Sequence, residues 1–223
     1  MRTHAAGAAG ASADTETPLS GEIFGALINL SGRRRFTSQC LVLFAVLGLH
    51  GEAGATQTAR DALKLFRDAH TVLVHGDRTL PGIFCPELND AYFGSLGADR
   101  AVLAFIDLAE RALQAIDSGS AAAPELLAEL TRSTTPTLAI LNQLTTIYEE
   151  QSKRHAVLMK KQLRGVITDI ETIAKQAKMV AFNARIVAAR AGQAGKEFAV
   201  VAGVLSNITI EIDDMVRVAL RST

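Results

Sequence analysis

The sequence predicts an all-α protein in which an antiparallel four-helix bundle continues into an antiparallel coiled-coil hairpin. Aromatic residues make up only 5% of the chain and Trp is absent, whereas hydrophobic residues reach 48%, a composition typical of packed helices. Apolar residues recur every three or four positions, and no stretch shows the alternation of a strand. Two heptad stripes near the C-terminus flank a short glycine-containing segment, which favours two helices that fold back on each other.

Composition divides the 223 residues into three parts: a disordered tail (1–17), a helical bundle (18–150) and a hairpin (151–223). The 23 basic and 23 acidic residues balance over the whole chain, which argues against a nucleic-acid-binding protein. Residues 152–223, however, hold 12 Lys/Arg and 6 Asp/Glu, a net charge of +6, and the rest holds 11 and 17, a net charge of −6. Either the basic part meets an acidic partner, or the two parts pack on each other.

The first helix of the bundle is expected to start with Thr17 as its N-cap and Pro18 in its first turn. The other expected helices cover 57–74, cover 87–116 with interruptions at Gly94 and Gly97, and run from 124 onward with a kink at Pro136. Short links between these segments favour an antiparallel arrangement.

The most apolar stretch, residues 36–51, is expected to be a buried core helix, since it is shorter than the ~20 residues that span a bilayer. Three preceding arginines, Arg33, Arg34 and Arg35, leave membrane association as an alternative. Two cysteines are too few for a disulfide framework, so a reducing, cytoplasmic location is expected, and Cys40 is expected to be buried.

The hairpin is predicted from apolar residues that step by three and four on both sides of Gly192–Gly195, which is expected to form the turn. The expected seam residues are Met159, Leu163, Val166, Ile170, Ile173, Ala177, Val180, Ala184, Val187 and Ala191, then Phe198, Val201, Leu205, Ile208, Ile212, Met215 and Ala219. Alanines on the first arm, including Ala174, Ala181 and Ala188, would allow close approach of the helices. A narrow hairpin exposes apolar area, so a homodimer in the form of a four-helix bundle is expected.

The residues around the turn resemble the signalling tip of methyl-accepting chemotaxis proteins. The similar words are IAKQ at 173–176, NAR at 183–185, AARAG at 188–192 and FAVVAG at 198–203. The resemblance implies a role in chemosensory signalling, with a tip that packs against other receptors and contacts a histidine kinase and its coupling adaptor. It carries over contact roles to Met179, Phe182, Asn183, Ile186, Arg190 and Val200, whereas Phe198 is expected to pack inside the seam.

A second resemblance covers residues 28–39, INLSGRRRFTSQ, which are similar to a signature of the sensor domain of the type IV pilus chemoreceptor PilJ and of nitrate-sensing kinases. That domain is a four-helix bundle. In the nitrate-sensing relatives an Arg of the motif binds the anion, which implies a small-anion site at Arg35 with Arg34 and Ser31 beside it. The alternative is that the three arginines form an exposed basic cluster.

Departures from the chemoreceptor pattern open a second hypothesis. Lys175 and Arg185 are basic where the family is apolar, and Val187 replaces an acid. Like charges would repel across a trimer axis, so the hairpin could instead be a non-signalling dimerisation or array-modulating module. No Glu or Gln pair suited to methylation is found on either arm.

Nothing in the sequence indicates an enzyme or a cofactor. No phosphate-binding or dinucleotide-binding glycine motif and no nucleophile motif is present. His50, His70, His75 and Cys85 lack the spacing of metal ligands, so no metal site is expected. Three hypotheses therefore follow: a chemotaxis transducer, an interaction module, and a small-oxyanion-binding protein.

Overall fold

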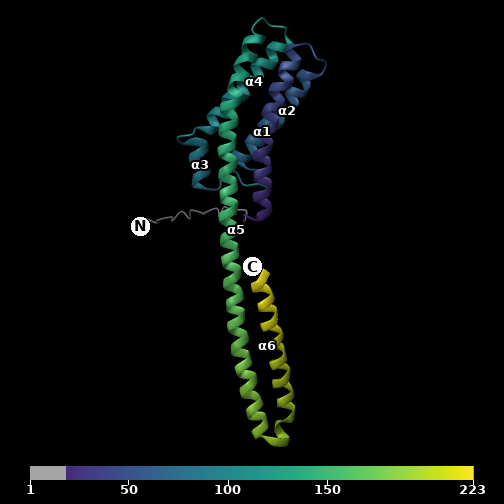
Figure 1. The fold of residues 1–223 in the computed structure, drawn as a ribbon, viewed down its shortest axis with the longest axis vertical. Coiled ribbons are helices and arrows are strands. Elements are labelled where there is room, and N and C mark those ends of the chain that lie inside the picture. The colour runs from purple at the N-terminus through teal and green to yellow at the C-terminus, as the bar shows by residue number, and fades with distance from the viewer. Residues whose placement is uncertain (1–18, 223) are drawn as a thin grey trace, which may run out of the picture. The chain divides into compact units, whose positions relative to one another are not determined.

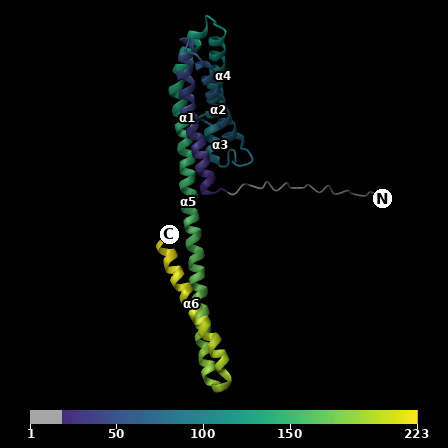
Figure 2. The same cartoon turned by 90° about the vertical axis from the view of Figure 1, so that its right-hand side faces the viewer.

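The computed structural model describes residues 19–222, and its helices fall into two compact units, one ending at Ser152 and the other starting at Lys153. The helices are α1 (Gly21–Leu49), α2 (Ala55–His75), α3 (Pro86–Phe93), α4 (Ala98–Asp117), α5 (Ala123–Arg190) and α6 (Lys196–Ser222), with a short 3₁₀ helix, η1 (Gly192–Gly195), before α6 (Figures 1 and 2). The described residues contain no strand, and the predicted all-α fold is confirmed. The predicted tail over residues 1–17 lies outside the described residues.

Helix α1 begins at Gly21 because Ser20 caps it. The Ser20 hydroxyl accepts a hydrogen bond from the backbone N–H of Ile23 at 3.2 Å, which satisfies one of the free donors of the first turn. The predicted start at Thr17 and Pro18 is therefore wrong, and both of these residues lie outside the described range.

The first unit contains two apolar clusters, and the larger one joins α1, α2, α4 and the first part of α5. Phe66 of α2 and Phe105 of α4 are both buried there, with their ring centroids 5.5 Å apart. The other buried members are Leu41, Val42, Ala45, Ala59, Ala62, Leu63, Val102, Ile106, Leu108, Ala109, Ala112, Leu113, Leu127, Leu130 and Leu141. Their spacing of three and four residues within each helix is the amphipathic pattern that the sequence shows.

The smaller apolar cluster closes the other end of the unit, where α3 covers it. Its buried members are Leu27, Leu73, Val74, Leu88, Ala91, Tyr92, Ala98, Leu144 and Tyr148. The interruption expected at Gly94 and Gly97 is present, and it divides the region over 87–116 into the two helices α3 and α4. The backbone of Gly97 is left-handed, at φ +57°, and it separates α3 from α4.

Of the apolar stretch over residues 36–51, residues 36–49 form the second half of α1 and residues 50–51 follow it in a turn, and only one side of the helix is buried. Leu41 and Ala45 are fully buried, whereas Phe36 and Leu43 are exposed. Cys40 is only half-buried, so its expected burial is not complete. Across residues 19–222, no helix combines the length and apolar character that crossing a membrane requires.

Helix α5 belongs to both units, since the boundary between Ser152 and Lys153 falls within its 68 residues. It continues through Pro136, the position of the predicted kink. In the turn where Pro136 supplies no N–H, the Thr137 hydroxyl donates to the Ser133 carbonyl at 2.8 Å.

The second unit is the predicted antiparallel hairpin, in which α6 returns alongside the last part of α5 (Figures 1 and 2). At the turn, Gly192 is left-handed at φ +59°. A Cβ on Gly195 would clash with the Ala188 carbonyl oxygen, so the chain passes too close to α5 for any other residue.

The line of contact inside the hairpin differs from the predicted seam. The buried positions recur every seven residues and carry mostly small side chains: Ile167, Ala174, Ala181 and Ala188 on α5, and Gly195, Ala202, Thr209 and Val216 on α6. Small side chains let the helices approach closely, and the bulkier stripe is left on one flank. Of the expected seam, Ala177, Ala184, Leu205, Ile212 and Ala219 are half-buried, whereas Phe198 and most of the larger residues are exposed.

Candidate functional site

A layer of buried polar side chains separates the two apolar clusters of the first unit. Arg34 of α1 is at its centre and is 0% exposed. Its Nη1 donates to His70 Nδ1 at 3.0 Å, and its Nη2 donates to the Ser31 hydroxyl at 3.3 Å. Ser31 in turn shares a 2.9 Å hydrogen bond with the Thr145 hydroxyl of α5. The cluster therefore joins three helices through side chains that apolar packing alone would not place there.

The Arg34 guanidinium makes no hydrogen bond to a carboxylate among the described residues. It is linked to one, Asp99, through the ring of His70. Arginine has donors alone, so His70 Nδ1 must accept, and His70 Nε2 therefore carries the proton that it donates to Asp99 Oδ1 of α4 at 3.0 Å. Arg34 Nε has no hydrogen-bond partner among the described residues. A buried guanidinium without a directly bonded carboxylate is costly, and this makes the cluster sensitive to any change in its members.

The pKa of His70 is lowered to about 4, first by burial and then by the neighbouring Arg34 cation, while the hydrogen bond and the charge of Asp99 act in the opposite direction. The unfolded chain binds the proton at the ordinary value of 6.5, so acid favours the unfolded state between pH 6.5 and 4. We expect the free energy of unfolding of the first unit to fall by up to about 1.4 kcal/mol per pH unit across this window.

Tyrosine fluorescence during urea unfolding measures this loss, because both tyrosines of the chain, Tyr92 and Tyr148, lie in the first unit. The variant His70→Gln keeps a donor and an acceptor but does not titrate, and it should lose less stability than the wild type between about pH 7 and about pH 5. An equal acid loss in both proteins would contradict this assignment.

Two other titratable side chains of the first unit, Tyr148 and Cys85, are held in their neutral forms. The Tyr148 hydroxyl donates to the Leu73 carbonyl at 3.5 Å and lies 3.4 Å from the Tyr92 hydroxyl, and burial raises the pKa of Tyr148. Burial also raises the pKa of the Cys85 thiol, which makes it a poor nucleophile. Among the described residues, no three His, Cys, Asp or Glu side chains come together as metal ligands.

Two of the three residues of the expected anion site contact each other, and the third lies elsewhere. Arg34 and Ser31 are both buried in the polar layer, whereas the Arg35 Nη1 donates to the Asn142 side chain at 3.0 Å on a more exposed part of the unit. Arg33 is exposed. The structure thus brings Arg34 and Ser31 together and places Arg35 apart from them.

The expected tip contacts lie on the outside of the hairpin, away from its buried line. Met179 and Phe182 are 66% and 62% exposed, and with Asn183, Lys175 and Lys178 they border a hollow of about 610 Å³ on α5. The remaining expected contacts are Ile186, Arg190 and Val200, which are also exposed. Lys175 is paired with Glu171 at 2.6 Å, and this hydrogen bond raises the pKa of the lysine.

A separate apolar stripe follows each arm of the hairpin. Its members are Val166, Ile173, Val180 and Val187 on α5, and Val201, Ile208 and Met215 on α6, all exposed. Each of them directly precedes a buried residue, and consecutive helical residues are turned by about 100°. Because the arms are antiparallel, this same offset points both stripes to one side of the hairpin.

Sequence reasoning missed the polar layer and the buried line. His70 stands in the apolar periodicity of α2 between Phe66 and Leu73, a position that indicates a buried histidine. Asp99 and Thr145 carry no such signal. The heptad line of small residues is visible in the sequence, since Ala174, Ala181 and Ala188 are seven residues apart, but the predicted seam follows the bulkier stripe next to it.

Comparison with protein families bears on the hairpin and on the end of the first unit. Residues 135–215 match the family model described as the methyl-accepting chemotaxis protein (MCP) signalling domain. Neither the curated proteins nor the solved structures gave a match. The resemblance of residues 28–39 to PilJ sensor domains stays a prediction. The match confirms the resemblance found around the hairpin turn, and it supports a chemotaxis transducer-like signalling role for this chain.

Proposed function

We propose that the chain is a chemotaxis transducer whose first unit senses a stimulus and whose hairpin controls a histidine kinase through its coupling adaptor. The family match over residues 135–215 carries this proposal. Helix α5 supports transmission of a signal from the first unit to the tip, because it begins among the helices of the first unit and ends at the hairpin turn. A stimulus that changes how α5 packs in the first unit would act on the same helix that bears the tip.

The working form is a homodimer, in which the exposed stripes of two hairpins meet to form a four-helix bundle. A stripe with heptad spacing on both arms is typical of a coiled-coil interface. The charges of the two arms also favour association with a second copy of the hairpin. Residues 153–190 hold 9 basic and 2 acidic residues, whereas α6 holds 3 and 4. In a two-fold four-helix bundle each α5 borders the α6 of the other copy, so basic and acidic arms adjoin.

Replacing Ile173 by glutamate tests the dimer. The side chain is exposed in the single hairpin, so the fold is unaffected, but a charge within the apolar interface should raise the dissociation constant at least about 100-fold. Sedimentation equilibrium of the full chain measures it. Thr172→Glu is the matched control, because Thr172 is the adjacent exposed residue and points away from the stripe. Equal association of both variants would contradict the dimer interface.

Replacing Phe182 by alanine tests the contact with the kinase and adaptor. A large, exposed apolar side chain at the centre of an interface accounts for about 2 kcal/mol or more of binding, which corresponds to about a 30-fold weaker complex. Co-sedimentation of the full chain with kinase and adaptor gives the affinity. Phe36→Ala removes an equally exposed phenylalanine from the first unit and should leave binding unchanged. No binding by the wild type, or equal binding by both variants, would overturn the proposal.

A non-signalling interaction module is the second candidate, and the basic residues at the tip favour it. Lys175 and Lys178 border the apolar hollow, and Arg185 lies a few residues further along α5. These cations would repel one another where several identical tips meet. Such a module would bind receptors or adaptor and leave the rate of kinase phosphorylation unchanged, which separates it from the transducer.

A further inference from the structure

A continuous chain of side-chain hydrogen bonds crosses the first unit from α4 to α5. It runs from Asp99 to His70 (3.0 Å), from His70 to Arg34 (3.0 Å), from Arg34 to Ser31 (3.3 Å) and from Ser31 to Thr145 (2.9 Å). Each of the helices α4, α2, α1 and α5 supplies a member. Four of these five side chains are fully or almost fully buried, whereas the Asp99 side chain is 24% exposed. The chain therefore has one end that reaches the surface.

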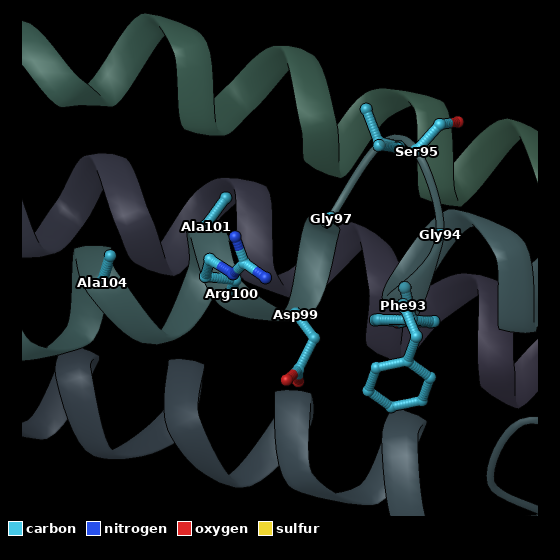
Figure 3. Close-up of a pocket in the computed structure, with 10 residues that line it drawn as sticks. Phe93, Gly94, Ser95, Gly97, Asp99, Arg100, Ala101 and Ala104 are labelled. Carbon is cyan, nitrogen blue, oxygen red and sulfur yellow. The ribbon is translucent and has the colours of Figure 1, made fainter.

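That exposed end opens into a cavity of about 520 Å³, formed by the end of α3, the connection over 94–97 and the start of α4. Figure 3 shows the Asp99 carboxylate and the Phe93 ring extending to the same side of this connection. Arg100, the next residue of α4, also lines the cavity and makes no ion pair with another described residue. Ser95 and the aromatic side chains of Tyr92 and Phe93 also line the cavity.

We propose that this cavity binds a small zwitterion, with Asp99 receiving its ammonium group and Arg100 its carboxylate, and that the hydrogen-bonded chain communicates occupancy to α5. The cavity has the volume of a small-molecule site. Its wall holds one carboxylate and one guanidinium, so a ligand with a single charge would meet a group of its own sign. A ligand with both charges satisfies both residues, and the Arg100 fork suits a carboxylate.

Binding at Asp99 acts on the chain because one carboxylate oxygen already accepts from His70. An ammonium group at the same carboxylate withdraws negative charge from the His70 N–H. The Arg34 guanidinium, which has no directly bonded carboxylate, then loses part of its compensation. The hydroxyls of Ser31 and Thr145 extend this effect to α5. Binding of the zwitterion does not depend on the proposed function, whereas the inference that α5 passes the signal to the tip rests on it.

Calorimetry on the full chain tests the binding step. The probes are glycine, L-alanine, β-alanine and 4-aminobutanoate, with propylammonium and propanoate as ligands of one charge. We expect at least one zwitterion to bind at least about 10-fold more tightly than either single-charge ligand. Asp99→Asn and Arg100→Gln should each weaken it at least about 10-fold, whereas Asp107→Asn, an exposed acid on the same helix, should not. No heat from any of the four zwitterions, or binding that survives both cavity variants, overturns the inference.

Amide hydrogen exchange tests the communication step in the absence of any kinase, so its failure is distinct from failure of the proposed function. The bound zwitterion should change exchange in α5 around Thr145. Thr145→Val removes the last hydroxyl of the chain at nearly constant volume and should abolish that change while the calorimetric affinity is kept. An identical exchange response in this variant shows that the hydrogen-bonded chain does not carry the effect.

Discussion

Gly195→Ala is expected to destabilise the hairpin by about 3 kcal/mol, the upper part of the range for overpacked sites. The added Cβ would clash with the Ala188 carbonyl oxygen and would lie 2.9 Å from both the Ala188 carbonyl carbon and its Cα. All three are backbone atoms, which no change of rotamer can move. The arms must therefore separate at the turn, and the contacts of Ala188 and Ala202 along the buried line are lost with it.

Urea unfolding followed by circular dichroism measures the effect of Gly195→Ala. The transition of the second unit should move to lower urea concentration, while tyrosine fluorescence, which reports on the first unit, stays unchanged. Gly165→Ala is the control. Gly165 lies in α5, and a Cβ added there would meet nothing within 4 Å outside the backbone of its own helix, so alanine should stabilise the helix by about 1 kcal/mol. A stable Gly195→Ala hairpin would mean that the turn is not the close passage described above.

Arg34→Ala is expected to cost the first unit about 3 to 5 kcal/mol, the range for breaking a buried charged network. The substitution removes a fully buried guanidinium, leaves His70 Nδ1 without its donor and opens a cavity between the two apolar clusters. Tyrosine fluorescence during urea unfolding gives the value directly.

The neighbouring arginine is the matched control for this prediction. Arg33 carries the same charge on the same helix but is exposed, so Arg33→Ala should change stability by no more than about 0.5 kcal/mol. Equal effects of the two substitutions would show that net charge, rather than the buried cluster, is what matters in this part of α1.

The hairpin was predictable from sequence because its signals are local. Heptad spacing on both arms and the glycines at 192 and 195 suffice to place two helices and a turn. Which of the two parallel stripes faces inward was not predictable from spacing alone. Both repeat every seven residues, and the choice falls to the small side chains at Ala174 and Ala181, which permit a closer approach than the neighbouring Ile173 and Val180.

The polar layer, in contrast to the hairpin, was not predictable from the sequence. Arg34, His70, Asp99 and Thr145 are far apart in sequence and have no shared spacing, so only the packed helices bring them together. A run of three arginines gives no indication that the middle one is buried and the first exposed. Helix geometry decides this, because successive residues are turned by about 100° and only one of the three can face the core.

The rate of kinase autophosphorylation shows whether the hairpin tip controls a histidine kinase. The wild-type chain, added to kinase and coupling adaptor, should change this rate, and Phe182→Ala should return it toward the rate of kinase and adaptor alone. Phe36→Ala should act as the wild type does. A rate that the wild-type chain leaves unchanged, despite binding, would contradict the transducer and favour the interaction module.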